Sequence, residues 1–196
     1  MLAHRERDLK KARRHYEAAL QWKPDQPNAL NNLAVLELDE GRLDEALALA
    51  ERAVRLDPDY FDGRTTLGNV LVACKHWERA LVQLDWVLQR TPGAIESRRH
   101  AVTCLLALGR YRPAAGNALL MLSQHPGDAA AQAQVAEALA HVLAGEPPDQ
   151  VAVQATNACR NGGVDAAPIV PLLERELRRL GATAQADALV AARRGG

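Results

Sequence analysis

The chain has 196 residues, of which 48% are apolar and only 4% are aromatic, a composition that favours closely packed helices over sheets. Lysine plus arginine (24) equals aspartate plus glutamate (24), so no net charge draws the chain to nucleic acid or to an anionic membrane. Three cysteines without a CxxC spacing, no apolar N-terminal segment and no apolar run of about 18 residues argue against disulfides, zinc, a signal peptide and a membrane span.

Four prolines recur with a constant 34-residue period, at Pro24, Pro58, Pro92 and Pro126. Self-similarity at a fixed period is typical of arrays of stacked supersecondary units. Twelve positions before each proline lies an alanine, at Ala12, Ala46, Ala80 and Ala114. Three positions before each alanine lies a large apolar residue, at Leu9, Leu43, Trp77 and Tyr111. The spacing predicts an array of equivalent units.

Each unit is predicted to be a helix, a tight turn, a second helix and a proline stop. Gly41 and Gly109 mark the turn, because the end of a helix often needs a positive φ that glycine adopts at least cost. The first helices carry apolar residues three and four positions apart, as Leu30, Leu33 and Ala34 do. Proline ends each unit because it cannot continue the second helix.

These residues resemble the tetratricopeptide repeat. The match is best in residues 28–60, where the family positions hold Leu30, Leu33, Ala34, Gly41, Ala46, Ala50, Ala53 and Pro58. Two positions depart from the family pattern. Its tryptophan is replaced by Leu30, Arg64 and Arg98, and its first aromatic residue by Glu37, Leu71 and Leu105. The resemblance implies an all-α, right-handed α-solenoid of stacked antiparallel helix pairs.

Residues 1–126 are expected to hold the second helix of a first repeat and then three 34-residue repeats. The first of these helices, residues 6–22, lacks a preceding partner, so its stripe of Leu9, Ala12, Tyr16 and Ala19 should be exposed unless something covers it. The chain is then either a piece of a longer array or associates with itself at this end. The basic run at residues 10–14, beside Arg5 and Arg7, is interpreted as solvated helix surface.

Residues 127–196 are expected to form a divergent repeat and C-terminal capping helices of the same solenoid. Helices are predicted at residues 129–144, from a cap at Asp149 to Asn161, at 168–180 and at 183–192. Gly162 and Gly163 are predicted to end the second of these helices, and Gly181 divides the last two.

No arrangement of residues predicts catalysis, a metal site or a cofactor. The histidines are scattered, at His4, His15, His76, His100, His125 and His141. Cys74 lies two residues before His76, but an activated thiol also needs a positioned base and a third orienting group. Acidic pairs at Asp44–Glu45 and Asp57/Asp59 fall at a helix start and in a turn, where caps and helix dipoles explain them.

By resemblance to the family, partner-facing residues lie on the first helices, which line the concave side of the solenoid. They are Asn28, Asn31, Asn32, Val35, Asp39, Thr65, Thr66, Asn69, Val72, Arg99, His100 and Thr103. Asparagine and threonine can hydrogen-bond to the backbone of an extended peptide. Asn69 and Arg99 suit a clamp on a C-terminal carboxylate, but the lysines that such a clamp needs are missing, so we do not expect one.

We therefore expect a cytoplasmic, non-catalytic scaffold or adaptor that binds a protein or an extended peptide in its concave groove, without nucleic acid or membrane insertion. A second hypothesis is a regulatory or substrate-recruiting repeat region of a larger enzyme, such as a glycosyltransferase or a sulfotransferase. A stand-alone enzyme is disfavoured, because no constellation supports it.

Overall fold

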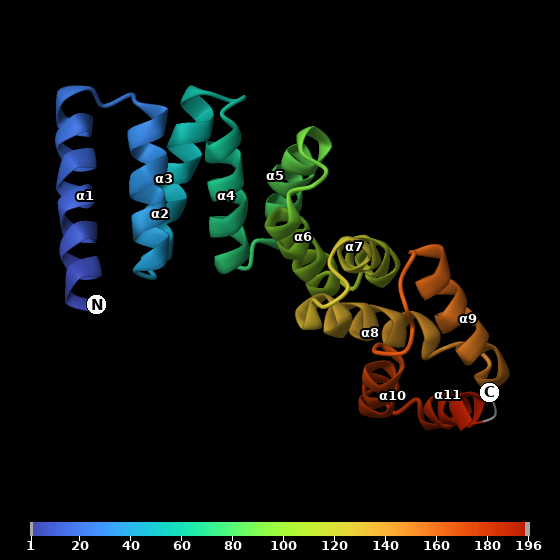
Figure 1. Ribbon diagram of the computed structural model, residues 1–196. Helices are drawn as coiled ribbons and strands as arrows, with labels where there is room; N and C mark the ends of the chain where they lie inside the picture. The colour runs from blue at the N-terminus through green and yellow to red at the C-terminus, as the bar shows by residue number, and fades with distance from the viewer. Residues whose placement is uncertain (1, 195–196) are drawn as a thin grey trace. The chain divides into compact units, whose positions relative to one another are not determined.

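The computed structural model describes the backbone of residues 2–194 and the side chains of residues 9–193. This part of the chain forms eleven helices and no strand (Figure 1). The helices are α1 (Leu2–Trp22), α2 (Pro27–Asp39), α3 (Leu43–Leu56), α4 (Phe61–Ala73), α5 (Trp77–Arg90), α6 (Ile95–Ala107), α7 (Tyr111–Gln124), α8 (Ala129–Leu143), α9 (Pro148–Asn161), α10 (Val170–Arg179) and α11 (Thr183–Arg194).

The helix boundaries repeat with the period of the prolines. The first helices of the three complete units, α2, α4 and α6, have 13 residues each, and successive ones begin one period apart. The second helices, α3, α5 and α7, have 14 residues each and follow the same period. The predicted units of helix, turn, helix and proline stop are therefore confirmed.

The turn within each unit has one residue in the left-handed region of backbone space. Gly41 (φ 75°) and Gly109 (φ 69°) hold this place as predicted, and Lys75 (φ 59°) holds it in the middle unit. The next residue donates its amide to the carbonyl five residues back, which satisfies a carbonyl that the helix end leaves open. These bonds join Arg42 to Glu37, His76 to Leu71 and Arg110 to Leu105, each at 2.8 Å.

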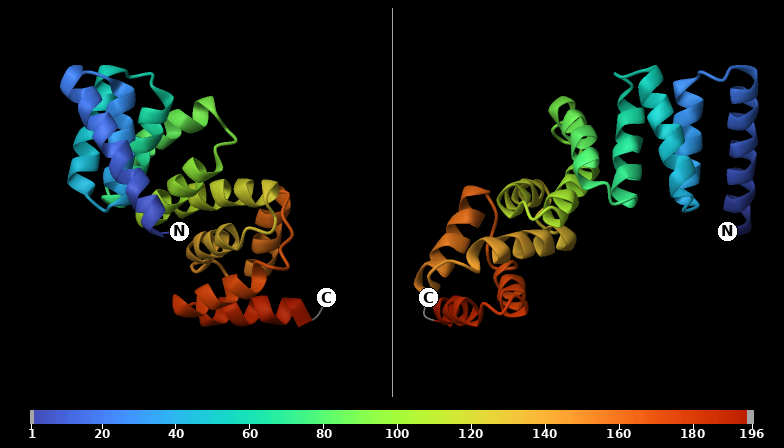
Figure 2. Two further views of the ribbon diagram at one scale, coloured as in Figure 1. Left: turned by 60° about the vertical axis from the view of Figure 1, so that its left-hand side comes forward. Right: turned by 180° about the vertical axis from the view of Figure 1, so that it is seen from behind.

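Two compact units make up the chain, residues 1–100 and residues 101–196. In the first unit α2 packs against α1, α3 and α4, and α4 packs against α5 (Figures 1 and 2). Ala46 and Ala80 are fully buried, so a small side chain lets the helices of each pair approach closely. The stripe on α1 at Leu9, Ala12 and Tyr16 is only partly exposed, because α2 packs against α1.

In the second unit α8 packs against α7, α9 and α10, and α11 packs against α9 and α10. The predicted glycine ends are confirmed, since Gly163 and Gly181 have φ of 68° and 76°. The cap predicted at Asp149 is wrong: Pro147 is the N-cap and Asp149 lies in the first turn of α9. The predicted helix at 168–180 is shorter in the structure, where α10 spans Val170–Arg179.

The repeat register continues to the start of α8 and is lost at α9. The first residue of α8, Ala129, follows that of α6, Ile95, by one full period. One period after Tyr111, where α7 begins, lies Gly145, whereas α9 begins only at Pro148. The sequence divides the chain into an array (1–126) and a divergent, capping part (127–196). This division is based on repeats, whereas the two compact units are defined by packing, so the predicted division stays a prediction.

Replacing Lys75 by glycine should stabilise the protein. A side chain in the left-handed region costs about 1–2 kcal/mol, which the glycine variant avoids. This gain is partly offset because glycine has more conformational freedom to lose when the chain folds. We expect a net gain of about 0.5–1 kcal/mol, seen as a higher urea midpoint. The reverse change, Gly109→Lys, should lower the midpoint at the equivalent turn. Equal midpoints for Lys75→Gly and the wild type would contradict this explanation of the turn.

Candidate functional site

Most of the residues predicted to contact a partner lie on one face of the first helices in residues 1–100. Their spacing of three, four and seven positions along α2 and α4 places them on one side of each helix. We call this set the first-helix face: Asn28, Asn32, Val35, Asp39, Thr65, Asn69, Val72, Arg99 and His100. Asn28, Val35 and Asp39 are exposed, and the other six side chains are half-buried.

Two of the predicted contact residues lie inside the protein instead. Asn31 is 5% exposed and Thr66 is 7% exposed. The Asn31 side chain lies close to that of Tyr60, the residue that precedes α4. Burial raises the pKa of the Tyr60 hydroxyl, and the negative charge of Asp62 adds to this effect. Asn31 and Thr66 are therefore part of the packed interior and do not belong to the first-helix face.

A polar link joins two helices across the first-helix face. Nδ1 of His100 on α6 lies 2.8 Å from Oδ1 of Asn69 on α4. Burial lowers the pKa of His100, which favours the neutral ring. Because Oδ1 of Asn69 can only accept, Nδ1 of His100 is the donor. The link fixes the orientation of the Asn69 amide on the surface.

The same link recurs one repeat later, within residues 101–196. There Nε2 of Gln134 on α8 donates to Oγ1 of Thr103 on α6 at 3.4 Å. Thr103 and Gln134 hold the repeat positions of Asn69 and His100, respectively, in the following repeat. Thr103, the last of the predicted contact residues, therefore holds the repeat position of Asn69. It belongs to the second compact unit.

Two more residues of the first-helix face have identifiable partners. Nε of Arg99 lies 3.5 Å from the Glu96 carboxylate, an exposed pairing of the kind that contributes little stability. Oγ1 of Thr65 donates to the carbonyl of Phe61 one turn earlier in α4, at 3.0 Å. Val35 is 38% exposed and gives the polar face an apolar patch. The face thus combines amide, hydroxyl and apolar groups on rigid helices.

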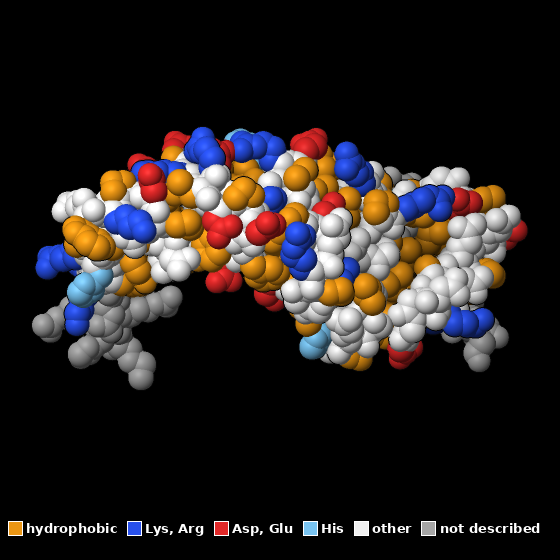
Figure 3. All heavy atoms as spheres, turned by 90° about the horizontal axis from the view of Figure 1, so that it is seen from above, with side chains coloured by type: hydrophobic (Ala, Val, Ile, Leu, Met, Phe, Trp, Pro, Cys, Tyr) orange, Lys and Arg blue, Asp and Glu red, His pale blue; other side chains and the backbone are white. Residues whose placement is uncertain are grey.

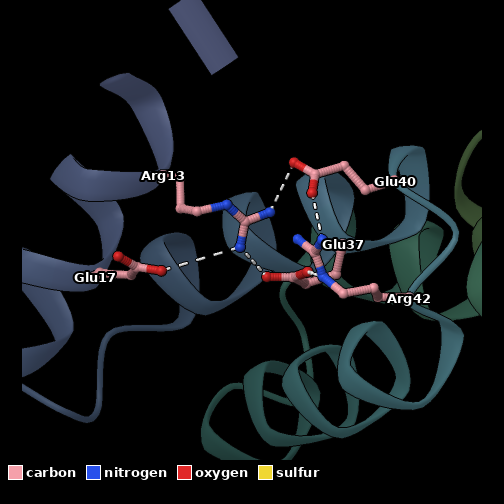
Figure 4. Close-up of polar contacts among 5 residues, drawn as sticks. All are labelled: Arg13, Glu17, Glu37, Glu40 and Arg42. Atoms are coloured by element: carbon pink, nitrogen blue, oxygen red, sulfur yellow. Dashed lines mark hydrogen bonds and ion pairs between the residues drawn. The ribbon is translucent and has the colours of Figure 1, made fainter. Parts of the chain in front are cut away.

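A buried carboxylate stands at the centre of an ion-pair cluster that the sequence analysis missed (Figure 4). Glu37 on α2 is 5% exposed and accepts hydrogen bonds from Arg13 on α1 and from Nε of Arg42. Arg13 also donates to Glu40 at 2.9 Å, and Arg42 forms an ion pair with Glu40. The signal in the sequence was a glutamate at an apolar repeat position.

The cluster keeps all its members charged. Burial alone would raise the pKa of Glu37, but the hydrogen bonds from Arg13 and Arg42 outweigh it and lower that pKa. The hydrogen bond to Glu37 raises the pKa of Arg13. Arg13 comes from the basic run at residues 10–14, so one of its charges serves packing between α1 and α2. The side chains of Arg5 and Arg7 lie outside the described residues.

A second unforeseen cluster surrounds Trp86 on α5. The guanidinium carbon of Arg90 lies 3.5 Å from the Trp86 ring centroid and that of Arg64 lies 4.6 Å from it. Arg64 holds the family's tryptophan position, and its Nε donates to the carbonyl of Pro58 at 2.6 Å. Arg98 makes the equivalent bond to Pro92, also at 2.6 Å. The arginines at this position therefore join α4 and α6 to the proline turns that precede them.

The cysteine, histidine and acidic side chains considered as possible catalytic groups take part in packing, ring stacking, helix starts and turns. Burial raises the pKa of Cys74 and of Cys159, which opposes formation of a reactive thiolate. His141 stacks on Tyr111 with ring centroids 3.9 Å apart. Asp44 and Glu45 lie in the first turn of α3, and the Asp57 side chain accepts from the amide of Asp59. The side chain of His4 lies outside the described residues.

The described residues contain no group of three or more histidine, cysteine or acidic side chains placed to hold a metal ion. Among them, no helix combines the length and the apolar character needed to cross a membrane. Basic and acidic side chains are interspersed on the face drawn in Figure 3, in keeping with the balanced composition.

The helix pairs define a class of repeat protein, the α-solenoids, and comparison with known proteins gives the family. Models of the tetratricopeptide repeat match residues 2–61 and residues 37–93. Residues 2–93 therefore carry tetratricopeptide repeats, and the fold of the described residues is the right-handed α-solenoid of antiparallel helix pairs predicted from the sequence.

A curated relative is Hsp70-Hsp90 organizing protein 2 of Arabidopsis thaliana, which is 30% identical over 79 residues. These residues are 40% of this chain and 14% of that protein, so the chain spans about a seventh of its relative.

Among solved structures the fold is similar to YrrB, described as a TPR protein with an unusual peptide-binding site. The TM-score is 0.63 at 18% identity, over 90% of this chain and 91% of that one. MamA gives a TM-score of 0.65 at 16% identity, over 91% and 94% of the two chains. A tetratricopeptide repeat protein from Parabacteroides merdae gives 0.65 at 17% identity, over 95% and 73%. At these identities the similarity shows the fold alone.

Replacing Glu37 by glutamine should destabilise the protein at pH 7, because Arg13 and Arg42 lose a charged acceptor that is buried. We expect a loss of about 2 kcal/mol in the free energy of unfolding, measured with urea. Because the pKa of Glu37 is lowered in the folded state, its contribution is present above the unfolded pKa of about 4.3 and is lost as the pH falls through the folded value.

The difference between the Glu37→Gln variant and the wild type should therefore shrink as the pH is lowered from 7 towards 3. Glu17→Gln is the matched control, since Glu17 is exposed and 4.0 Å from Arg13, and it should cost less than about 0.5 kcal/mol. A Glu37→Gln variant as stable as the wild type at pH 7 would show that the cluster contributes no net stability.

Proposed function

We propose that this chain is a scaffold that binds an extended segment of another protein along the first-helix face of residues 1–100. The observation that carries the proposal is the row of accessible amides at Asn28, Asn32 and Asn69, which lies beside the apolar side chains Val35 and Val72. Amides bond to peptide N–H and C=O groups whatever the side chains of the peptide, whereas the valines favour an apolar residue.

The rigidity of this face supports the proposal. Its side chains come from helices packed on both sides, and the bond between His100 and Asn69 holds one amide in place. A surface that is ordered before binding loses less conformational entropy when a partner arrives. Arg99 on α6 adds hydrogen-bond donors to the face and is paired with Glu96 at 3.5 Å.

The names of similar proteins agree with a scaffold role. YrrB is described as having a peptide-binding site, and the Arabidopsis relative is named as an organizing protein of Hsp70 and Hsp90. We propose no carboxylate clamp, because the first-helix face carries no lysine. The alternative of a recruiting region within a larger enzyme stays a prediction, as does a cytoplasmic location.

The proposal is tested by a variant that removes three polar groups from the face, Asn32→Ala with Asn69→Ala and Arg99→Ala. Proteins captured from a lysate by the wild type are identified, and their binding segments are synthesised as peptides. We expect at least a tenfold weaker affinity, because about 1.4 kcal/mol corresponds to tenfold and three polar contacts are lost.

The control variant removes two amides and one guanidinium from exposed positions on second helices of the same unit, Gln21→Ala with Arg55→Ala and Gln89→Ala. Its affinity should equal that of the wild type, and thermal melting should show that both variants are folded. Equal binding by the first-helix variant would place the site elsewhere and refute the proposal.

A further inference from the structure

The second unit contains a pocket of about 400 Å³ between α7, α8 and α9. Its apolar lining includes Ala115 and Leu119 of α7 and Leu139 and Leu143 of α8, all of them buried in the core. The pocket lies on the side of the second helices α7 and α9. It shares no residue with the first-helix face, which belongs to the other unit.

The pocket lies where α9 leaves the repeat register. The connection before α9 is longer than the tight turns of the earlier units, and Nε2 of Gln185 on α11 holds it by donating to the carbonyls of Ala144 and Glu146, both at 3.1 Å. At its other end α9 comes close to α7: a Cβ on Gly162 would lie 2.9 Å from Cβ of Leu119. α9 packs less extensively on α8 than α3 does on α2, and this leaves a cavity.

Polar side chains surround the apolar lining on two walls. Gln154, Asn157 and Asn161 are spaced three and four positions apart on α9, so their amides form a row along the pocket. Nε2 of Gln154 is held by Glu146 at 3.2 Å and by Gln150 at 3.4 Å. Arg112 at the start of α7 is exposed and is the charged residue of the pocket lining.

Gly116 in the wall of the pocket has no explanation within the chain. It lies in the middle of α7, where glycine is the poorest helix former apart from proline. A Cβ added there would meet no atom within 4 Å, so no neighbouring helix requires its absence. A helical glycine beside an open pocket allows a ligand to approach the helix backbone closely.

We propose that this pocket is a second binding site, which accepts an extended peptide segment with a large apolar side chain next to an acidic residue. The apolar side chain fills the lining at Leu119 and Leu139, as buried anchors do in peptide complexes. The amide row of α9 bonds to the peptide backbone, and Arg112 pairs with the carboxylate. Gly116 gives the peptide backbone room beside α7.

The test uses a displayed library of random twelve-residue peptides, selected on the wild-type chain. Selected peptides are synthesised, and their affinities are measured by fluorescence polarisation. The blocking variant is Gly116→Leu, which adds a large side chain at the pocket lining. It should melt at the same or a higher temperature than the wild type, because leucine is the better helix former, so lost binding cannot be attributed to unfolding.

The matched control is Ala48→Leu, which adds the same side chain to an exposed position two repeats earlier. We expect enriched peptides with an adjacent apolar and acidic pair, about tenfold or more weaker binding to Gly116→Leu, and unchanged binding to Ala48→Leu. Arg112→Gln should weaken the same peptides, but not versions in which the acidic residue is replaced by its amide.

Peptides that bind Gly116→Leu as tightly as the wild type would overturn the proposal, as would a selection that enriches no such pair. Each peptide is also measured on the Asn32→Ala, Asn69→Ala and Arg99→Ala variant. Peptides lost on that variant alone report the first-helix face, count against the pocket and leave the proposed function standing.

Discussion

A constant interval between equivalent backbone positions is the constraint on which the rest of the structure depends. It places a proline after each second helix, a left-handed residue between the two helices of a unit and a fully buried alanine such as Ala46 or Ala80 where they approach. Because each unit buries its apolar stripe only against its neighbours, a constant interval is what brings matching stripes together. Part of the first-helix face follows from it, since Asn69 lies one repeat after Val35 and His100 lies two repeats after Asn32.

Within this frame the chain replaces apolar or aromatic family positions by charged residues that find local partners. Glu37 accepts from Arg13 and Arg42, and Arg64 and Arg98 bond to the carbonyls of Pro58 and Pro92. Each substitution joins two elements of the stack that a tryptophan or a leucine would have joined by packing. The two candidate binding surfaces depend on the register in opposite ways: one displays polar groups where the register is kept, and the other opens where α9 departs from it.

The fold could be predicted from the sequence because its signals are local and periodic. The prolines, the glycines at 41 and 109 and the alanines report backbone geometry at their own positions, and the structure confirms them. Most of the first-helix face follows from the same spacing. The burial of Asn31 and Thr66, the partner of Glu37 and the pocket beside Gly116 could not be predicted, because each depends on how a distant side chain or helix packs.

Deleting one whole repeat tests the governing role of the interval most directly. Removal of residues 59–92 takes out one complete repeat and joins Pro58 to Gly93, the residue at the same repeat position as Asp59. We predict that this shorter chain keeps its helical circular-dichroism spectrum and a cooperative thermal transition. A second deletion chain, which also carries one alanine inserted after Val102 in the middle of α6, should not, because an extra residue within a helix turns the rest of its stripe by about 100°. If both deletions lose the transition alike, or both keep it, the interval does not determine the stacking.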